Sequence, residues 1–532
     1  MNNKKNIFIV AAVLILLIGI FLRTHNLREW LYFYPDQARD IMLVEEVVEE
    51  GGEWPSYGPI AARANFQLGP MHYYFQIISG KLFGVTPEAM AYPDVLFAIL
   101  SIPLFFYFMS RYFRYGSSLA LAGLYSVSFF AVEYSRFAWN PNPIPFFVLL
   151  FLISLWKLIF HREKTGWLWI TALAAALGAG IQIHTWLLLL MPATLFLGLV
   201  FVFRKNQSWL LAKKTLAILV LAATLNAPQI IGEVKNNFTN SGYFWELFAG
   251  SSQKGKENFA HYLKLDILNH SQANAHIVSS LGPKLDFKAS SAIKRMTKEK
   301  NWEKEEYLAL GGILASLLFT IFGYAALIYF FIKESDREKK YFLGTVVLYA
   351  GLSFLVMHFV MEDLSIRYFI HLVFVPFVFL GFLVKIIKKR FSRKIFPAVA
   401  VLFVFLAAAN LWNIAKEARA HAQKDRSNER YVVLGEIEPM AEYIISRSPE
   451  KTIYFFAQGK YMQNYFKQFN YLFHQSGYAV EKDEDLGSFP SEKKIYMLWH
   501  SSRYGPPEYE GAYRVTDQKD FGQVGIYELE KK

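Results

Sequence analysis

The chain of 532 residues contains no cysteine, and only 19% of its residues are charged. Without cysteine it can form no disulfide, no thiolate metal site and no cysteine nucleophile. Charge is also missing from long stretches, since Ile7–Leu22 and Ala398–Ile414 carry none and the gap from Trp167 to Phe203 extends over 37 residues. A membrane-spanning helix needs about 20 mostly apolar residues, so these uncharged stretches exclude an ordinary soluble protein.

Apolar residues are abundant instead, at 54% of the chain. They form segments bounded by charge, and eleven of these are candidate membrane spans. The segments lie near residues 7–22, 92–109, 117–133, 143–160, 167–183, 185–203, 215–232, 308–332, 341–361, 368–386 and 395–412. The first resembles a signal peptide, but Arg23–Asn26 offers no small-residue cleavage site, so we interpret it as a retained anchor.

The formal net charge of +12 is distributed unevenly. If the N-terminus is cytoplasmic, the inner segments carry 20 Lys and Arg against four Asp and Glu, whereas outer residues 23–88 carry five against nine. This distribution follows the positive-inside rule and forms no compact basic patch of the nucleic-acid-binding type. The sequence therefore predicts a multi-pass plasma-membrane protein in contact with the lipid bilayer, with an extracytoplasmic C-terminal domain and no nucleic-acid partner.

Three large segments lie on the outer side in this topology: residues 23–88, residues 233–306 and the tail from 413 to 532. The tail alternates strand-like and helical patterns. Strands are expected near 451–457, 493–500 and 525–529, and helices near 431–447 and 460–473. We therefore predict a mainly α polytopic membrane protein with about 11 transmembrane helices over residues 1–412, followed by a small α/β domain over 413–532.

The first outer loop holds the strongest candidate for catalysis. Pro35 precedes Asp36 and favours a helix start, where a carboxylate is stabilised by the free backbone amides. Residues 41–50 place valines and Ile41 on one face and glutamates largely on the other, which is typical of a helix on a membrane surface. A second such stretch covers 69–84. From spacing alone, Asp36 is either a catalytic carboxylate or a helix cap.

Four local patterns resemble the GT-C superfamily of membrane glycosyltransferases, in the branch of protein O-mannosyltransferases and lipid A aminoarabinose transferases. Asp36-Gln37-Ala38 resembles the family's Asp-Glu-Ala motif. Gly69–Tyr74 resembles its Lys/His-Pro-Pro-Leu-Tyr-Tyr segment and is followed by Leu82-Phe83-Gly84. Tyr134–Asn142 resembles the segment after the third span, and Arg367-Tyr368 resembles an Arg-Tyr pair before a late span. The resemblance covers about residues 1–412.

This resemblance implies an enzyme that transfers a sugar from a polyprenyl-phosphate donor to a hydroxyl of a lipid, glycan or protein acceptor, with inversion, on the outer face of the membrane. Asp36 is then the general base. Arg367 is the expected phosphate ligand because its planar fork fits a phosphate. Alternatively, Arg367 reaches to water or pairs with Glu362 or Asp363.

The chain also departs from the family pattern. Gln37 replaces a second acidic residue, and the lysine of the surface-helix motif is missing. Asp40 lies one turn after Asp36, where it either substitutes in part for that acid or is a solvated surface residue.

Other residues are predicted to contact substrate. His184 interrupts the 37-residue uncharged stretch at an outer turn, where it serves the site or is a satisfied turn residue. Asn140 either bonds a sugar hydroxyl or caps the fourth span. The further candidates are Gln37, Arg39, His72, Tyr73 and Tyr368. His358, Glu362 and His371 are too loosely spaced to define a metal site, so a divalent cation stays possible and no metal ligand is assigned.

Two other functions are compatible with these features. The many spans and scattered polar groups also suit a flippase or transporter of lipid-linked sugars. The Gln37 departure suits an inactive homologue that acts as a scaffold.

Overall fold

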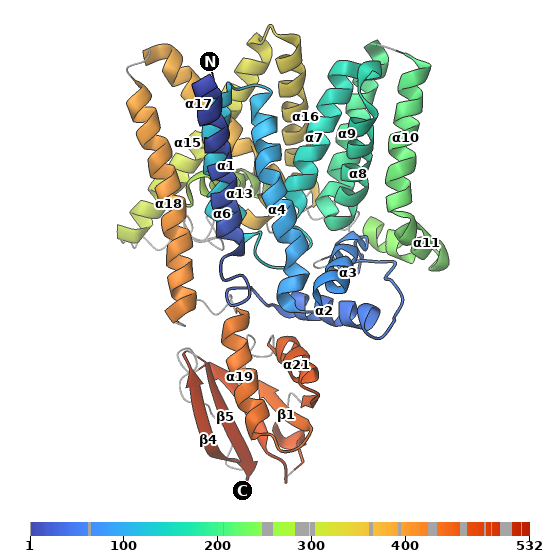
Figure 1. Ribbon diagram of the computed structural model, residues 1–532, viewed down its shortest axis with the longest axis vertical. Helices are drawn as coiled ribbons and strands as arrows, with labels where there is room; N and C mark the ends of the chain where they lie inside the picture. The colour runs from blue at the N-terminus through green and yellow to red at the C-terminus, as the bar shows by residue number, and fades with distance from the viewer. Residues whose placement is uncertain are drawn as a thin grey trace.

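The computed structural model describes residues 2–532 with gaps at 62–64, 206, 247–258, 282–296, 298–303, 361–364, 392–394, 424–432, 458–464, 483–485, 491, 501–512 and 523. A helical bundle forms one end of the molecule and a small sheet domain the other (Figure 1). The first part of the bundle contains α1 (Asn2–Thr24), α4 (Pro87–Ser110), α5 (Tyr115–Ser126), α6 (Phe129–Glu133), α7 (Ile144–His161), η1 (Arg162–Lys164), α8 (Trp167–Ile183), α9 (Thr185–Lys205) and α10 (Trp209–Leu225). The second part contains α13 (Phe259–Ser279), α15 (Lys304–Lys333), α16 (Arg337–Val360), η3 (Ile366–Leu372), α17 (Val375–Phe391) and α18 (Phe396–Gln423).

All eleven predicted spans are largely helical. Among the described residues, seven helices are long and apolar enough to cross a membrane, namely α1, α4, α7, α9, α15, α16 and α18. Two more candidates are bent pairs, α10 with α11 (Ala227–Lys235) at 63° and η3 with α17 at 68°. The predicted span at 117–133 is divided into α5 and α6, and α8 has only 17 residues. A multi-pass membrane architecture is confirmed, while the number of eleven spans stays a prediction.

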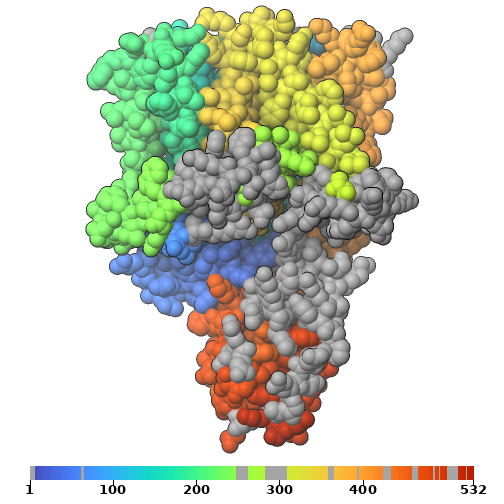
Figure 2. All heavy atoms as spheres, turned by 180° about the vertical axis from the view of Figure 1, so that it is seen from behind, coloured from blue at the N-terminus to red at the C-terminus, as the bar shows by residue number. Residues whose placement is uncertain are grey.

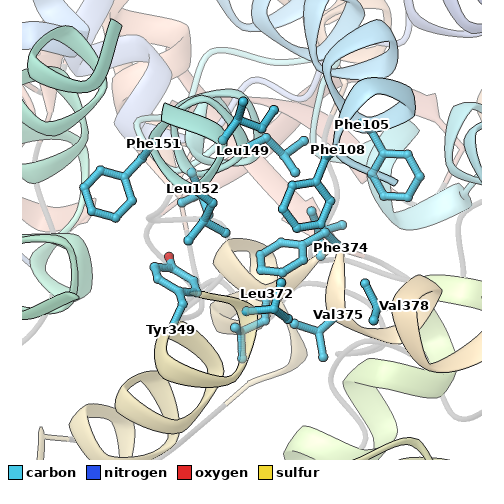
Figure 3. Packing of buried hydrophobic residues seen from close by; sticks show 14 of the residues in the cluster. Phe105, Phe108, Leu149, Phe151, Leu152, Tyr349, Leu372, Phe374, Val375 and Val378 are labelled. Carbon is cyan, nitrogen blue, oxygen red and sulfur yellow. The ribbon is translucent and has the colours of Figure 1, made fainter. Parts of the chain in front are cut away.

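The bundle is held together by interlocking aromatic rings. Phe108 lies 5.1 Å from Phe374 in a T-shaped pair, and Phe105 lies 5.3 Å from Phe377 in another. Figure 3 shows Phe105, Phe108 and Phe374 packed with Tyr349 and Leu152 in the core of the bundle. Because lipid tails are as apolar as leucine, such helices associate by close packing rather than by exclusion of water. This packing fixes the positions of the helix ends and therefore of the loops that connect them.

Two of the large segments predicted to share one side of the membrane, the first loop and the tail, lie at the same end of the bundle (Figure 1). This end lies opposite the N-terminus in Figure 1. The first loop carries α2 (Pro35–Val48) and α3 (Met71–Phe83), so both predicted segments are helical, while their position on a membrane surface stays a prediction. It is joined to the long loop because Asn240 Oδ1 accepts from the backbone N–H of Gln67 at 2.6 Å. Which side of the membrane this end faces stays a prediction.

The C-terminal domain is a five-stranded mixed sheet of order β2-β1-β3-β5-β4. Its elements are α19 (Leu434–Arg447), β1 (Thr452–Ala457), α21 (Phe466–Gln475), β2 (Ala479–Lys482), η5 (Leu486–Ser488), β3 (Ile495–His500), β4 (Tyr513–Phe521) and β5 (Val524–Lys531). The three expected strands and two expected helices are confirmed. The sequence did not predict β2 and β4, the two edge strands, because their residues are largely solvated and lack an apolar pattern.

This domain packs directly on the first loop. One apolar cluster combines α2 residues such as Val44 with Phe469 of α21. The ring of Phe33 lies 5.6 Å from that of Tyr471, and the backbone N–H of Leu434 donates to the carbonyl of Leu31 at 2.9 Å. Seen from behind, the first loop (blue) lies between the bundle and the sheet domain (orange to red), as Figure 2 shows. The tail therefore covers the face of α2 that points away from the bundle.

Candidate active site

Asp36 stands at the start of α2 as an accessible carboxylate. Pro35 is the first residue of the helix, where its missing N–H costs nothing. The side chain of Asp36 is 55% exposed, and its Oδ1 accepts from Nη1 of Arg39 at 2.9 Å. The charge therefore sits at a helix N-terminus beside a cation, with open space around it, as a carboxylate that meets a substrate requires.

Asp40, one turn later, is buried. Its side chain is 4% exposed, which shows that the expectation of a solvated surface residue was wrong. Both Nε and Nη2 of Arg39 donate to Oδ1 of Asp40, at 2.8 and 2.6 Å, and the hydroxyl of Tyr73 donates to the same oxygen at 3.2 Å. Burial raises the pKa of Asp40, against the opposing effect of Arg39. Arg39 thus links an exposed carboxylate to a buried one.

The loop of residues 134–142 is held by elements on several sides. Nε2 of Gln37 on α2 donates to the carbonyl of Ala138 at 2.5 Å. Nδ2 of Asn140 donates to the carbonyl of Ile183, at the end of α8, at 2.7 Å. Asn140 therefore does not cap α7, whose N-cap is Pro143 without a side-chain bond. Gln37 stands where the family motif has its second acidic residue, and its amide supplies a hydrogen-bond donor that an ionised carboxylate lacks.

A buried histidine and aspartate hold the same loop from the other side. Nε2 of His72 lies 3.3 Å from Oδ2 of Asp94, and the backbone N–H of Trp139 donates to that oxygen, also at 3.3 Å. His72 and Asp94 are 1% and 0% exposed. His72 was a predicted site residue and Asp94 was not, although a lone carboxylate inside an apolar segment is itself a signal of function.

Arg367 on η3 lies over this loop. Its guanidinium is 5.8 Å from the ring centroid of Trp139 and 5.2 Å from that of Tyr368, both within cation–π range. An aromatic path leads from it back to α2, because Phe137 stacks on Trp139 at 5.9 Å and meets Tyr34 at 6.3 Å. Tyr34 precedes Pro35 and Asp36, so the path connects the predicted base region with the predicted phosphate ligand.

His184 presents a donor near Arg367. Its Nδ1 accepts from the backbone N–H of Trp186 at 3.2 Å, so the proton of the neutral ring is assigned to Nε2. His184 interacts electrostatically with both Arg367 and His371. His371 is satisfied internally, since its Nδ1–H donates to the carbonyl of Tyr368 at 2.9 Å and its Nε2 accepts from Ser353.

The missing lysine of the surface-helix motif has a steric explanation. Gly69 takes its place, and a Cβ there would collide with Cβ and Cγ of Gln182. Gln182 is fixed, because its Nε2 donates to the carbonyls of Gly178 and Leu225 at 2.8 and 3.0 Å. A lysine therefore has no room at position 69.

Among the described residues, no three His, Asp or Glu side chains converge as metal ligands. Glu362 lies outside the described residues, as does Asp363, the other expected partner of Arg367. The side chain of His358 is not described either.

Comparison with known proteins agrees with this geometry. Residues 67–231 match the model of the dolichyl-phosphate-mannose-protein mannosyltransferase family. The whole chain is similar in fold to ArnT from Cupriavidus metallidurans, in structures of the apo state and of the protein bound to undecaprenyl phosphate. Each match has a TM-score of 0.53 and covers 99% of this chain and 98% of ArnT, at 12% and 14% identity respectively. No curated protein sequence matches the chain significantly.

Residues 67–231 thus match a mannosyltransferase family, and the chain as a whole shares its fold with ArnT. The family-model match includes α3, α4 and the 134–142 loop, and thus His72, Asp94 and Trp139. Asp36 and Arg367 lie outside the match, so their roles are argued from the geometry described above.

Proposed function

We propose that this protein transfers a sugar from a polyprenyl-phosphate donor to an acceptor hydroxyl at the outer face of the membrane, with inversion. The observation that carries the proposal is the exposed carboxylate of Asp36 at the start of α2, connected by a continuous aromatic path to Arg367. The ArnT structure with bound undecaprenyl phosphate supports a lipid phosphate as the leaving group. The acceptor is a lipid, glycan or protein.

Asp36 is the general base of the reaction. It takes the proton of the acceptor hydroxyl as the oxygen attacks the anomeric carbon from the face opposite the phosphate. The new bond joins that oxygen to the anomeric carbon, and the bond between this carbon and the phosphate oxygen breaks. The electron pair leaves with the polyprenyl phosphate, so the configuration at the anomeric carbon is inverted.

Arg367 binds the departing phosphate. Its position over Trp139 and Tyr368 fixes the plane of the guanidinium, which can then donate two parallel hydrogen bonds. The Nε2–H of His184 is a further donor on the same side. Such fixed donors stabilise the charge that develops on the phosphate oxygen as the glycosidic bond breaks.

The remaining candidates position this machinery. Arg39 and Tyr73 are engaged with Asp40, while Gln37, His72 and Asn140 hold the 134–142 loop directly or through Asp94. Each of these side chains has at least one protein partner, so we assign them to the shape of the site rather than to the reacting atoms.

Asp36→Asn tests the proposal. The variant keeps size and hydrogen bonding but removes the base, so sugar transfer in membranes should fall by two to four orders of magnitude, roughly the contribution of a general base. Glu46→Gln is the matched control, since Glu46 is an exposed carboxylate on the same helix. Transfer at the wild-type rate by Asp36→Asn would disprove the assignment.

Reconstitution in vesicles separates the enzyme from the two alternatives. A labelled polyprenyl-phosphate sugar should yield a glycosidic product of inverted configuration. Movement of the intact lipid between leaflets without bond cleavage would instead identify a flippase. If neither occurs in membranes that contain native acceptors, the chain is a scaffold.

A further inference from the structure

Helix α13 is polar and yet buried. It packs against η3, which carries Arg367, and against α6, which leads into the 134–142 loop. It therefore borders the candidate active site without having been assigned any part in it. Its buried polar side chains are Asp266, His270, Ser271, Gln272, Asn274 and His276.

Two polar side chains on one face of α13 form hydrogen bonds with α15. Nε2 of His270 lies 3.0 Å from the hydroxyl of Tyr324, and Nδ2 of Asn274 donates to the hydroxyl of Thr320 at 3.2 Å. Each of these two side chains thus has a partner on α15, although Nδ1 of His270 has none among the described residues.

The face that carries Gln272 and His276 is different. These residues are one helical turn apart and therefore adjacent, and they are only 3% and 6% exposed. Both amide atoms of Gln272 and both ring nitrogens of His276 have no hydrogen-bond partner within the described part of the chain. Each unpaired buried polar group costs about 1–3 kcal/mol, so four in adjacent turns point to a ligand that pairs with them.

Gln272 and His276 are uncharged, and each offers both a hydrogen-bond donor and an acceptor. Burial lowers the pKa of His276 to about 4, so near neutral pH its ring offers one donor and one acceptor. The amide of Gln272 offers both as well. The pair brings no positive charge, which argues against a phosphate as its ligand, whereas a hydroxyl both donates and accepts.

Aromatic rings extend from this pair to the active site. The ring of His276 lies 6.3 and 6.4 Å from those of Phe129 and Phe130. Phe130 contacts Tyr134 at 4.7 Å, and Tyr134 contacts Trp139, the platform of Arg367, at 5.8 Å. Aromatic faces beside neutral hydrogen-bonding groups suit a sugar, which has apolar C–H faces and a polar hydroxyl edge.

We infer that Gln272 and His276 form a subsite for the hydroxyl groups of an uncharged sugar. This inference rests on the proposed function, since it assigns a carbohydrate to the site beside Arg367. The sugar belongs either to the lipid-linked donor or to a glycan acceptor, because both carry the same hydroxyl chemistry.

The experiment compares full-length wild type with Gln272→Met and His276→Phe, which keep the volume or the ring and remove hydrogen bonding. Ser271→Ala is the control, because the Ser271 hydroxyl donates within the helix to the carbonyl of Ile267. Binding is measured for undecaprenyl phosphate, bare and carrying mannose, glucose or N-acetylglucosamine. Transfer is measured as labelled sugar incorporated into native membrane acceptors.

If the donor sugar occupies the subsite, the variants bind the sugar-bearing lipid roughly three- to ten-fold more weakly, the loss expected for one neutral hydrogen bond, and bind the bare lipid like wild type. If an acceptor sugar occupies it, both lipids bind normally and transfer falls by a similar factor. Equal weakening for both lipids, or wild-type binding and transfer in both variants, would overturn the inference. Absence of transfer by the wild type would refute the proposed function instead, while lipid binding still tests the donor arm.

Discussion

The backbone N–H of Trp139 donates to Oδ2 of Asp94, the oxygen that Nε2 of His72 also approaches at 3.3 Å. This contact joins α3 and α4 to the ring on which Arg367 rests. A buried carboxylate at the edge of the bundle thereby controls where the predicted phosphate ligand lies.

Replacing Asp94 should therefore affect both stability and lipid binding. Asp94→Leu leaves the donors on His72 and Trp139 unpaired in a buried place, which should cost about 1–3 kcal/mol for each. Asp94→Asn keeps an acceptor oxygen and should cost less. Thermal unfolding in detergent and binding of undecaprenyl phosphate measure the two effects. Asp336→Asn, an exposed carboxylate, is the control, and equal behaviour of Asp94→Leu and this control would contradict the prediction.

Asp40 should make the stability of the protein depend on pH. Because burial raises its pKa above the ordinary 3.8, the folded state holds the proton more tightly than the unfolded state. The stabilisation by this proton is fully present below the unfolded pKa and is lost as pH rises through the folded pKa. Asp40→Asn, which cannot ionise, should therefore gain unfolding temperature relative to wild type as the pH rises above about 4, the ordinary pKa of an aspartate.

Arg39 supplies a second variant for the same measurement. Its positive charge lowers the pKa of Asp40 against the effect of burial, so Arg39→Met should raise that pKa further. The loss of stability with rising pH should then be larger than in wild type. If the pH dependence of wild type, Asp40→Asn and Arg39→Met were identical, this role of Asp40 would be ruled out.

Arg367→Gln should weaken binding of undecaprenyl phosphate by about ten- to a hundred-fold, the range for lost hydrogen bonds to a charged group. Arg367→Lys should recover only part of the affinity, because an ammonium lacks the planar fork. Lys81→Gln is the control, since Lys81 is also a cation over an aromatic ring, that of Trp54 at 5.0 Å. Unchanged affinity of Arg367→Gln would remove this residue from the phosphate site.

Substitutions in the tail can test whether its contact with the α2 region matters for activity. Tyr471→Ala removes the ring that packs on Phe33 and should lower sugar transfer, because α2 loses part of its cover. Tyr527→Ala removes a buried ring from the other apolar cluster of the sheet, and should cost a similar 3–5 kcal/mol without touching α2. Transfer and thermal unfolding are measured for both variants. Equal losses of transfer at equal stability would show that the contact with α2 has no effect.

The membrane segments and the two surface helices were predictable because their signals are local. A run of apolar residues, a proline at a helix start or a repeat of valines is visible within a few turns. The partners in the site are not local: Gln37 and Ala138 are 101 residues apart, and Asn140 and Ile183 are 43 apart. The periodicity of a sequence does not show which distant residues come into contact. The burial of Asp40 and the hydrogen bond from Trp139 to Asp94 could therefore be recognised only in the folded structure.

The position of the sheet domain also sets an order of events during synthesis. The helix that carries Asp36 emerges among the first fifty residues, but the side chains that cover its outer face, including Phe469 and Tyr471, come more than four hundred residues later. Until then the apolar side of α2 has no tail partner. The candidate catalytic carboxylate is therefore brought into its final surroundings only when nearly the whole chain has been made, so that a truncated product, although it contains every predicted catalytic residue, would have an incomplete site.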